Sequence, residues 1–268
     1  MNMTICISAI AKENNGEEII VFGTDHMVST QIGQFEHEIK KYKLINKNIV
    51  AMLSGNTLLF DRCIKGIDRD ADFFSVREKI RQNMEKLRKE IIENEVYKVY
   101  NIDDNFVKDI LKQQICNQYL DKILDTISKF SLKTSILLVG FDNNNKAQIS
   151  EIGEEGYMDF RDVNFHAVGS GTIQAINTLL FQRHSKDNNL KTAVYNVLKA
   201  KKNAEVAEGV GKETELLILK KSGVSEICSE DLEVLTKIYK EELNLGKNHQ
   251  DLNTLKSINN YKKEGEIK

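Results

Sequence analysis

The chain has 268 residues, of which 41% are hydrophobic and 29% charged, and this is enough to bury one sizeable core without a division into several domains. Its 38 Lys and Arg residues are balanced by 40 Asp and Glu residues, so the basic excess of a nucleic-acid-binding protein is absent. No apolar run approaches the roughly 20 residues that cross a bilayer, and the first ten residues, MNMTICISAI, do not resemble a signal peptide. We therefore expect a cytoplasmic protein that binds neither nucleic acid nor a membrane.

The motifs of the chain predict no metal or nucleotide site. There is no C-x-x-C pair and no metal-spaced pair of histidines, so neither a zinc knuckle nor a disulfide framework is expected. The Gly-Ser-Gly-Thr step at 169–172 lacks the Gly-Lys ending of a P-loop and the third glycine of a dinucleotide-binding fingerprint. We expect no cofactor, and reduced, mostly buried thiols. The cysteines are Cys6, Cys63, Cys116 and Cys228.

The N-terminal fifth of the chain is predicted to be nearly all strand. Residues 4–12 and 18–25 alternate between apolar and polar positions, and Asn15-Gly16 between them suits a tight turn with positive φ, so we expect a β-hairpin. A second pair of strands is expected at 28–34 and 39–46. It leads to the apolar strand NIVAMLSG at 48–55.

Helical and strand patterns then follow each other in blocks. Apolar residues recur every three or four positions from Leu58 to Ile91 and over 107–127, which predicts two long amphipathic helices in antiparallel packing. The remaining elements are expected as strands at 134–141, 146–152 and 164–168, helices at about 172–184 and 190–206, strands at 214–220 and 224–228, and a helix from Ser229.

Blocks of strands followed by blocks of helices are typical of layered α+β packing and not of a doubly wound sheet. We expect a single domain over residues 1–243. Residues 244–268 are polar and lysine-rich with no periodic apolar stripe, which predicts a mobile tail.

A threonine stands at the head of the first predicted strand. When a threonine is the first residue of a chain, its own α-amine, with a pKa of about 8, can accept the proton that its hydroxyl loses on attack. Such an amine works better when a nearby cation lowers its pKa and a carboxylate holds that cation. Asp25 ends the second strand and Lys41 begins the fourth, so Thr4, Asp25 and Lys41 are candidate catalytic residues.

With these residues, the sequence resembles the proteasome β-type subunits of the N-terminal-nucleophile hydrolases, together with the bacterial ring proteases of the HslV and Anbu kinds. Thr4 through Lys12 is similar to the family's first strand, and the separation of Asp25 and Lys41 by 16 residues is the family's own spacing. Thr4 and Asp25 are farther apart than is usual, and the turn ENNGE accommodates the extra residues. The resemblance covers residues 4–240.

The resemblance also assigns residues farther along the chain. Gly55 stands where the family has the glycine after its third core strand. AVGSG at 167–171 is similar to the family's Gly-Ser-Gly motif, which makes Ser170 the serine that hydrogen-bonds the threonine amine. The family's Arg-Asp-x-x-Ser-Gly segment is replaced here by AEVAEGVG, with Glu205 in place of the aspartate and Glu208 in place of the serine.

The resemblance implies a four-layer α-β-β-α sandwich and a threonine peptidase without a cofactor. Thr4 would be the nucleophile, Lys41 would lower the pKa of its amine, Asp25 would hold Lys41, and the N–H of Gly55 would bind the oxyanion. Family members enclose their active sites in rings, so the expected partners are copies of this chain and a peptide or unfolded protein substrate. An ATPase unfoldase is a further partner that the resemblance allows.

Removal of Met1, Asn2 and Met3 is required before Thr4 has a free amine. Initiator methionine is normally removed only before a small residue, which Asn2 is not, whereas initiation at Met3 would place Thr4 in the second position. Self-cleavage by Thr4 is the other route, although a bulky Met3 side chain would crowd that attack. We predict initiation at Met3.

Other interpretations of these residues remain open. Taken singly, Thr4 is an ordinary strand residue, Asp25 a turn residue, Lys41 a solvated lysine and Ser170 a helix N-cap. A catalytically silent ring or scaffold subunit would keep its N-terminus, and the two glutamates favour it. A threonine-dependent peptide ligase or small-amide hydrolase would use the same nucleophile. A plain interaction domain is the remaining alternative, in which the tail is regulatory.

Overall fold

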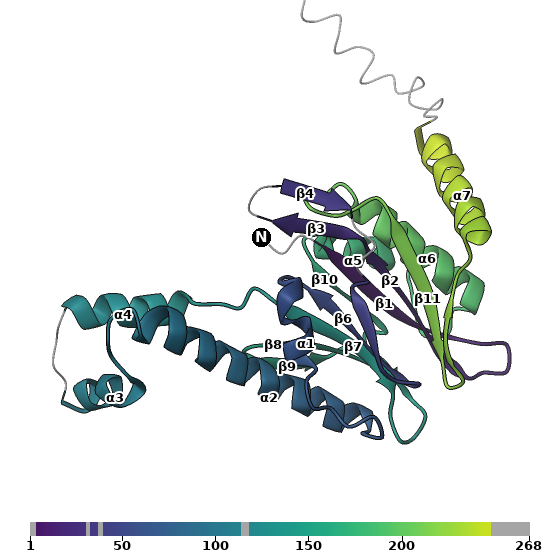
Figure 1. Ribbon diagram of the computed structural model, residues 1–268. Helices are drawn as coiled ribbons and strands as arrows, with labels where there is room; N and C mark the ends of the chain where they lie inside the picture. Colours follow the sequence, from purple (N-terminus) through teal and green to yellow (C-terminus); the bar gives the residue numbers. More distant parts are fainter. Residues whose placement is uncertain (1–3, 31–32, 37–39, 114–117, 248–268) are drawn as a thin grey trace, which may run out of the picture. The chain divides into compact units, whose positions relative to one another are not determined.

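The chain is an α+β protein built on two five-stranded antiparallel sheets (Figure 1). A computed structural model describes residues 4–30, 33–36, 40–113 and 118–247. The strand order is β10-β1-β2-β11-β12 in the first sheet and β5-β6-β7-β8-β9 in the second. The predicted α+β class is thus confirmed.

The first sheet is built around the N-terminal hairpin. β1 (Ile5–Lys12) and β2 (Glu18–Asp25) pair from Cys6 opposite Thr24 to Lys12 opposite Glu18. The turn between them contains Gly16 at φ 83°, a conformation that favours glycine. The other strands of this sheet are β10 (Phe165–Gly169) beside β1, β11 (Thr214–Lys220) beside β2, and β12 (Gly223–Glu226) at the edge.

Strand pairing after the hairpin differs from the prediction. β3 (Met27–Thr30) pairs with β4 (Gly33–Glu36) in a two-stranded sheet of its own, and β5 (Tyr42–Asn46) pairs with β6 (Ile49–Ser54). The expected pairing of 28–34 with 39–46 is therefore wrong. The missed signal is a turn, in which the side chain of Asn46 accepts the N–H of Asn48 at 2.9 Å and reverses the chain between β5 and β6.

The second sheet continues through β7 (Ser135–Phe141), β8 (Ala147–Gly153) and a strand that was not predicted, β9 (Gly156–Asp159). Alternate residues of each strand face opposite sides of the sheet. Thus Val50 and Met52 of β6 belong to an apolar cluster with β1 and β2, whereas Ala51 and Leu53 pack with α2. This alternation places one core between the two sheets and a second core under the helices.

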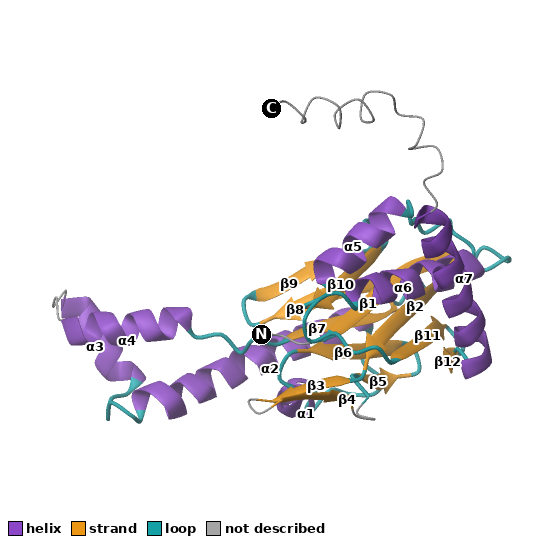
Figure 2. Ribbon diagram, turned by 90° about the horizontal axis from the view of Figure 1, so that it is seen from above, coloured by secondary structure: helices purple, strands orange, loops and turns teal. Residues whose placement is uncertain are grey.

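Helices cover the outer side of each sheet (Figure 2). α5 (Thr172–Phe181) contacts β10 and β1, and α6 (Leu190–Ala204) contacts β1, β2 and β11. α1 (Phe60–Cys63), which follows a 3-10 turn at Thr57–Leu59, and α2 (Phe73–Ile92) pack on the second sheet. The single helix expected over 58–91 is thus divided at a loop that contains Gly66 at φ 69° and the helix-capping residue Asp72.

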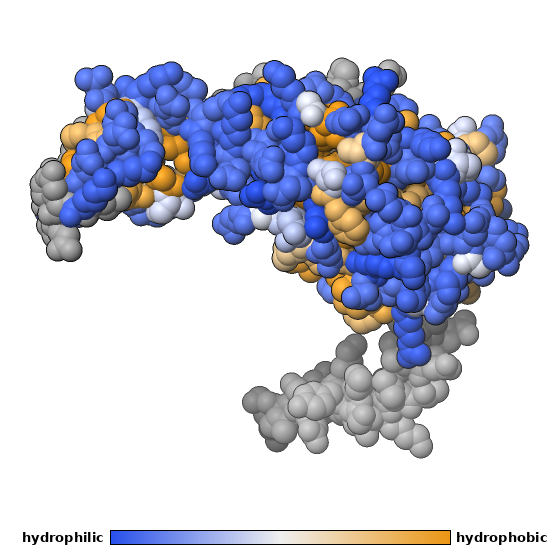
Figure 3. Space-filling model, turned by 90° about the horizontal axis from the view of Figure 1, so that it is seen from below, coloured by the Kyte–Doolittle hydropathy of each residue, from blue (hydrophilic) through white to orange (hydrophobic). Residues whose placement is uncertain are grey.

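The helical segment continues beyond α2 through a π turn at Glu93–Tyr97 to α3 (Asp104–Gln113) and α4 (Gln118–Lys129). The apolar stripe predicted at 107–127 falls on both of these helices, with 114–117 outside the described residues. Ile92, Val96 and Ile123 form a small apolar cluster here, apart from the sheet core. Figure 3 shows apolar surface at this end and also over the sheet region, on a face that is otherwise largely hydrophilic.

α7 (Ser229–Lys247) belongs to a separate unit that begins at Cys228. The helix extends past the domain boundary expected after residue 243, and 248–268 lie outside the described residues. No helix in the described ranges is both long enough and apolar enough to cross a membrane. Cys6 and Cys63 are buried and free, whereas Cys228 is exposed, and Cys116 is among the residues not described.

Candidate functional site

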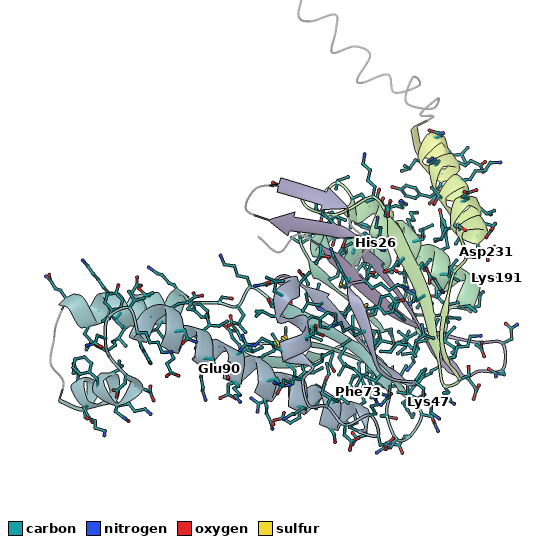
Figure 4. All side chains as sticks on the ribbon, in the orientation of Figure 1. His26, Lys47, Phe73, Glu90, Lys191 and Asp231 are labelled. Atoms are coloured by element: carbon teal, nitrogen blue, oxygen red, sulfur yellow. The ribbon has the colours of Figure 1, made fainter. Side chains whose placement is uncertain are left out.

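Antiparallel pairing brings Asp25 to Thr4. Because the start of β1 lies opposite the end of β2, residues separated by 21 positions in the chain become neighbours. The hydroxyl of Thr4 donates to Oδ1 of Asp25 at 2.5 Å, and the N–H of Ile5 donates to the same oxygen at 3.2 Å. Both Thr4 and Asp25 are buried. In Figure 4, the labelled His26 marks the chain just beyond Asp25.

Lys41 enters from the second sheet. It immediately precedes β5, where its carbonyl accepts the N–H of Leu53 in β6 at 2.9 Å. Its ammonium lies 2.6 Å from Oδ1 of Asp25 and also donates to the hydroxyl of Thr4. The Lys41 and Asp25 side chains are 1% and 0% exposed. The three predicted residues therefore form one buried triangle between the two sheets.

The carbonyl of Thr4 is held by the Gly-Ser-Gly step after β10. Gly169 has φ 120°, and a Cβ at this position would lie 2.1 Å from the Thr4 oxygen, so only glycine fits. The N–H of Ser170 donates to that oxygen at 2.9 Å, and the Ser170 hydroxyl approaches it at 3.4 Å. Ser170 is thus at the site, where it contacts the Thr4 carbonyl. It is not the N-cap of α5, because that position is Gly171.

Gly55 follows β6 near the same point. Its φ is 110°, and a Cβ would lie 2.1 Å from the carbonyl oxygen of Lys133, so this position also requires glycine. Ser54, the residue before it, is buried, and its Oγ would be 3.2 Å from a Cβ placed on Gly169. Gly55 therefore adjoins a residue that packs beside Gly169, the glycine that lies against the Thr4 carbonyl.

Glu205 was predicted to take the place of the family's aspartate at the active site, and the structure places its side chain elsewhere. The Glu205 carboxylate contacts the ammonium groups of Lys201 at 2.6 Å and Lys202 at 2.8 Å, and none of its described contacts is with Thr4. Glu208 is exposed. The group in the loop after α6 that reaches the site is the N–H of Gly211, which donates to Oδ2 of Asp25 at 2.7 Å.

Cys6, two residues after Thr4, is an alternative candidate nucleophile, but its environment disfavours this role. Burial raises the pKa of its thiol to about 12, so very little of it is ionised at neutral pH. Its Sγ lies 3.5 Å from the carbonyl oxygen of Leu53. Within the described ranges, no group of three or more His, Cys, Asp and Glu side chains could hold a metal ion.

The fold has a counterpart among solved structures. No family model matches the chain, and no curated protein matches its sequence. It superposes on a Gly-1 mutant of Anbu from Hyphomicrobium sp. strain MC1 with a TM-score of 0.61 and 11% sequence identity, over 92% of this chain and 97% of that chain. The chain has the fold of Anbu. The resemblance predicted from the motifs therefore holds at the level of the fold.

Sequence reasoning missed two residues that contact the site residues. Gly211 was overlooked because a glycine whose N–H binds a carboxylate has no side-chain signature. Lys201 was overlooked because it lies in a run of lysines, AKKNA, in an amphipathic helix, where a solvated position is the usual expectation. The available signal was its place on the apolar face, between Val197, Leu198 and Ala204, which are all buried.

Proposed function

We propose that this chain is a threonine-type N-terminal-nucleophile hydrolase that cleaves peptide bonds. The supporting observation is that Thr4 is buried and that its hydroxyl forms hydrogen bonds with both the Lys41 ammonium and the Asp25 carboxylate. A buried ion pair is seldom more stabilising than apolar residues of the same volume. Its placement around one hydroxyl therefore favours a catalytic role.

In the proposed reaction, Oγ1 of Thr4 attacks the scissile carbonyl carbon. The free α-amine of Thr4 accepts the hydroxyl proton and returns it to the leaving amine. Water then hydrolyses the threonine ester and restores the hydroxyl. The Lys41 ammonium favours the neutral amine by charge repulsion, and Asp25 holds that ammonium at 2.6 Å.

The N–H of Gly55 is the proposed oxyanion donor. One such donor is typically worth about 3 kcal/mol of the activation barrier. Ser170 and Gly169 would hold the Thr4 backbone in place, since both lie against its carbonyl. The helices over each sheet and the shared apolar cluster between the sheets support the four-layer α-β-β-α arrangement as part of this proposal.

The proposed active form begins at Thr4. We expect the intact mass of the purified active protein to correspond to a chain without Met1, Asn2 and Met3, and peptide-amide hydrolysis to appear only in that form. A chain forced to begin at Met1 should be much less active. If a Met1-initiated chain converts fully to Thr4 and Thr4→Ala prevents this, the route is self-cleavage, which would contradict initiation at Met3.

The proposed protease works as a ring of identical subunits. α5 supports this assembly, because Ile173, Leu180 and Phe181 lie at i, i+7 and i+8 on one helix face and expose 71%, 56% and 83% of their surfaces. A contiguous exposed apolar face of this kind marks an interaction site. We expect mass photometry at micromolar concentration to detect a closed oligomer and not a 30.6 kDa monomer. A monomer alone would contradict the ring and favour a small-amide hydrolase.

A catalytically silent subunit is the second candidate. It is favoured by the loop after α6, where Glu205 contacts Lys201 and Lys202 in place of Thr4 and Glu208 is exposed. A native protein that retains Met1, Asn2 and Met3 in its intact mass, with no turnover of peptide amides, would establish this candidate over the peptidase.

A further inference from the structure

A second buried lysine lies behind the carboxylate of Asp25. Lys201, near the end of α6, is 0% exposed. Its ammonium donates to the carbonyl oxygens of Gly211 at 2.7 Å and Lys212 at 2.9 Å, and to Oε1 of Glu205 at 2.6 Å. These three contacts use the full hydrogen-bonding capacity of a protonated lysine.

Gly211 connects this lysine to the candidate site. Its carbonyl accepts from Lys201, and its N–H donates to Oδ2 of Asp25 at 2.7 Å. The other oxygen of Asp25 contacts Lys41 and the hydroxyl of Thr4. A continuous hydrogen-bonded path therefore runs from α6 through the loop before β11 to the threonine.

Folding stability does not account for a lysine at this position. Burial lowers the pKa of Lys201 to about 8 although the Glu205 carboxylate, and to a smaller extent that of Asp25, act in the opposite direction, while Lys202 adds to the lowering. The charged form is thus disfavoured by folding, and an apolar residue of similar size would avoid this cost. Such a lysine is expected where its charge or its hydrogen bonds serve a site.

We propose that Lys201 is a positioning residue, which acts through Gly211 to orient the Asp25 carboxylate toward Lys41 and Thr4. The proposal rests on the proposed threonine-hydrolase function. Lys201 holds the loop so that the Gly211 N–H points at Asp25, and its positive charge stabilises that carboxylate. Glu205 takes part only as the partner that holds Lys201 on its other side.

Two neighbouring lysines provide the test. Lys201→Met removes the buried ammonium and keeps the length of the side chain. Lys202→Met is the matched control, because Lys202 contacts the same Glu205 and the carbonyl of Lys212, at 3.2 Å, but lies at the edge of the network with 17% of its side chain exposed. We expect Lys201→Met to lower kcat/KM for a peptide amide at pH 7 by about tenfold, the usual effect of losing a hydrogen bond to a charged group. Lys202→Met should equal the wild type.

The pH profile separates this role from a structural one. Below pH 8, wild-type Lys201 is charged, and the difference from Lys201→Met should be largest. As Lys201 loses its proton above pH 8, it loses its charge and one of its three donors, so the ratio of the two kcat/KM values should become smaller. The charged groups that face it are Glu205, Lys202 and Asp25. A constant ratio at all pH values, equal activity, or a loss that follows a large fall in melting temperature would overturn the proposal. An equal loss in Lys202→Met would overturn it as well.

Hydrogen–deuterium exchange of the full chain gives a readout without catalysis. We expect Lys201→Met, and not Lys202→Met, to accelerate exchange in the 209–212 segment, because the loop that carries the Gly211 N–H loses its anchor. If the wild type with a free Thr4 shows no turnover, the proposed function fails, and exchange still decides the positioning role. Unchanged exchange in Lys201→Met would overturn that role.

Discussion

Thr4→Ala is expected to abolish peptide-amide hydrolysis while leaving the fold intact. The substitution removes the nucleophilic oxygen, and loss of a nucleophile in comparable hydrolases lowers kcat by about 10⁴-fold or more. The Lys41 and Asp25 pair keeps its own contact at 2.6 Å, so no buried charge loses its partner. The stability cost should therefore be limited to about 1–3 kcal/mol for one hydroxyl with charged partners.

The measurement is kcat/KM with a fluorogenic peptide amide, with intact mass and circular dichroism on the same sample. Thr178→Ala is the matched control, since Thr178 is also a buried threonine but its hydroxyl contacts Gln174 and Asn203 on the helices. It should keep full activity. Turnover above background in Thr4→Ala would end the proposed mechanism.

Lys41→Ala is expected to remove most of the rate and a large part of the stability. Its ammonium is the cation beside both the Thr4 hydroxyl and Asp25, so its loss should lower kcat/KM by about 10²–10⁴-fold. Asp25 would be left as a buried carboxylate without its cation, which typically costs about 3–5 kcal/mol. Its remaining hydrogen bonds, from the Gly211 N–H at 2.7 Å, the Ile5 N–H at 3.2 Å and the Thr4 hydroxyl, should keep the cost toward the lower value.

Lys40→Ala is the control for this prediction. Lys40 is the preceding residue, yet its side chain is 56% exposed and lies over the ring of Tyr42, 3.7 Å from the carboxylate of Glu215. An exposed pair of this kind contributes no more than about 1 kcal/mol. Urea unfolding and kcat/KM should therefore show little change. Equal losses in the two variants would mean that Lys41 has no special place at the site.

The sequence by itself determined the parts of the site that depend on neighbouring strands. The turn at Gly16 and the alternation of apolar residues set the β1–β2 register, and that register alone brings Asp25 to Thr4. The motif spacing selected Lys41, which does enter the same triangle. The Thr4–Asp25 contact and the overall α+β class were therefore predictable from local turn chemistry and strand periodicity, whereas Lys41 was selected by the family resemblance.

Only the tertiary structure decided what surrounds Asp25. The Gly211 N–H reaches this carboxylate across 186 positions of sequence, because α6 and β11 pack against β2. The same packing turns Lys201 inward against the carbonyl groups of Gly211 and Lys212, and Glu205, one helical turn farther along, contacts this lysine and not Thr4. No local pattern distinguishes a buried lysine from a solvated one in such a helix, since the difference lies in which carbonyl groups the distant chain presents to it.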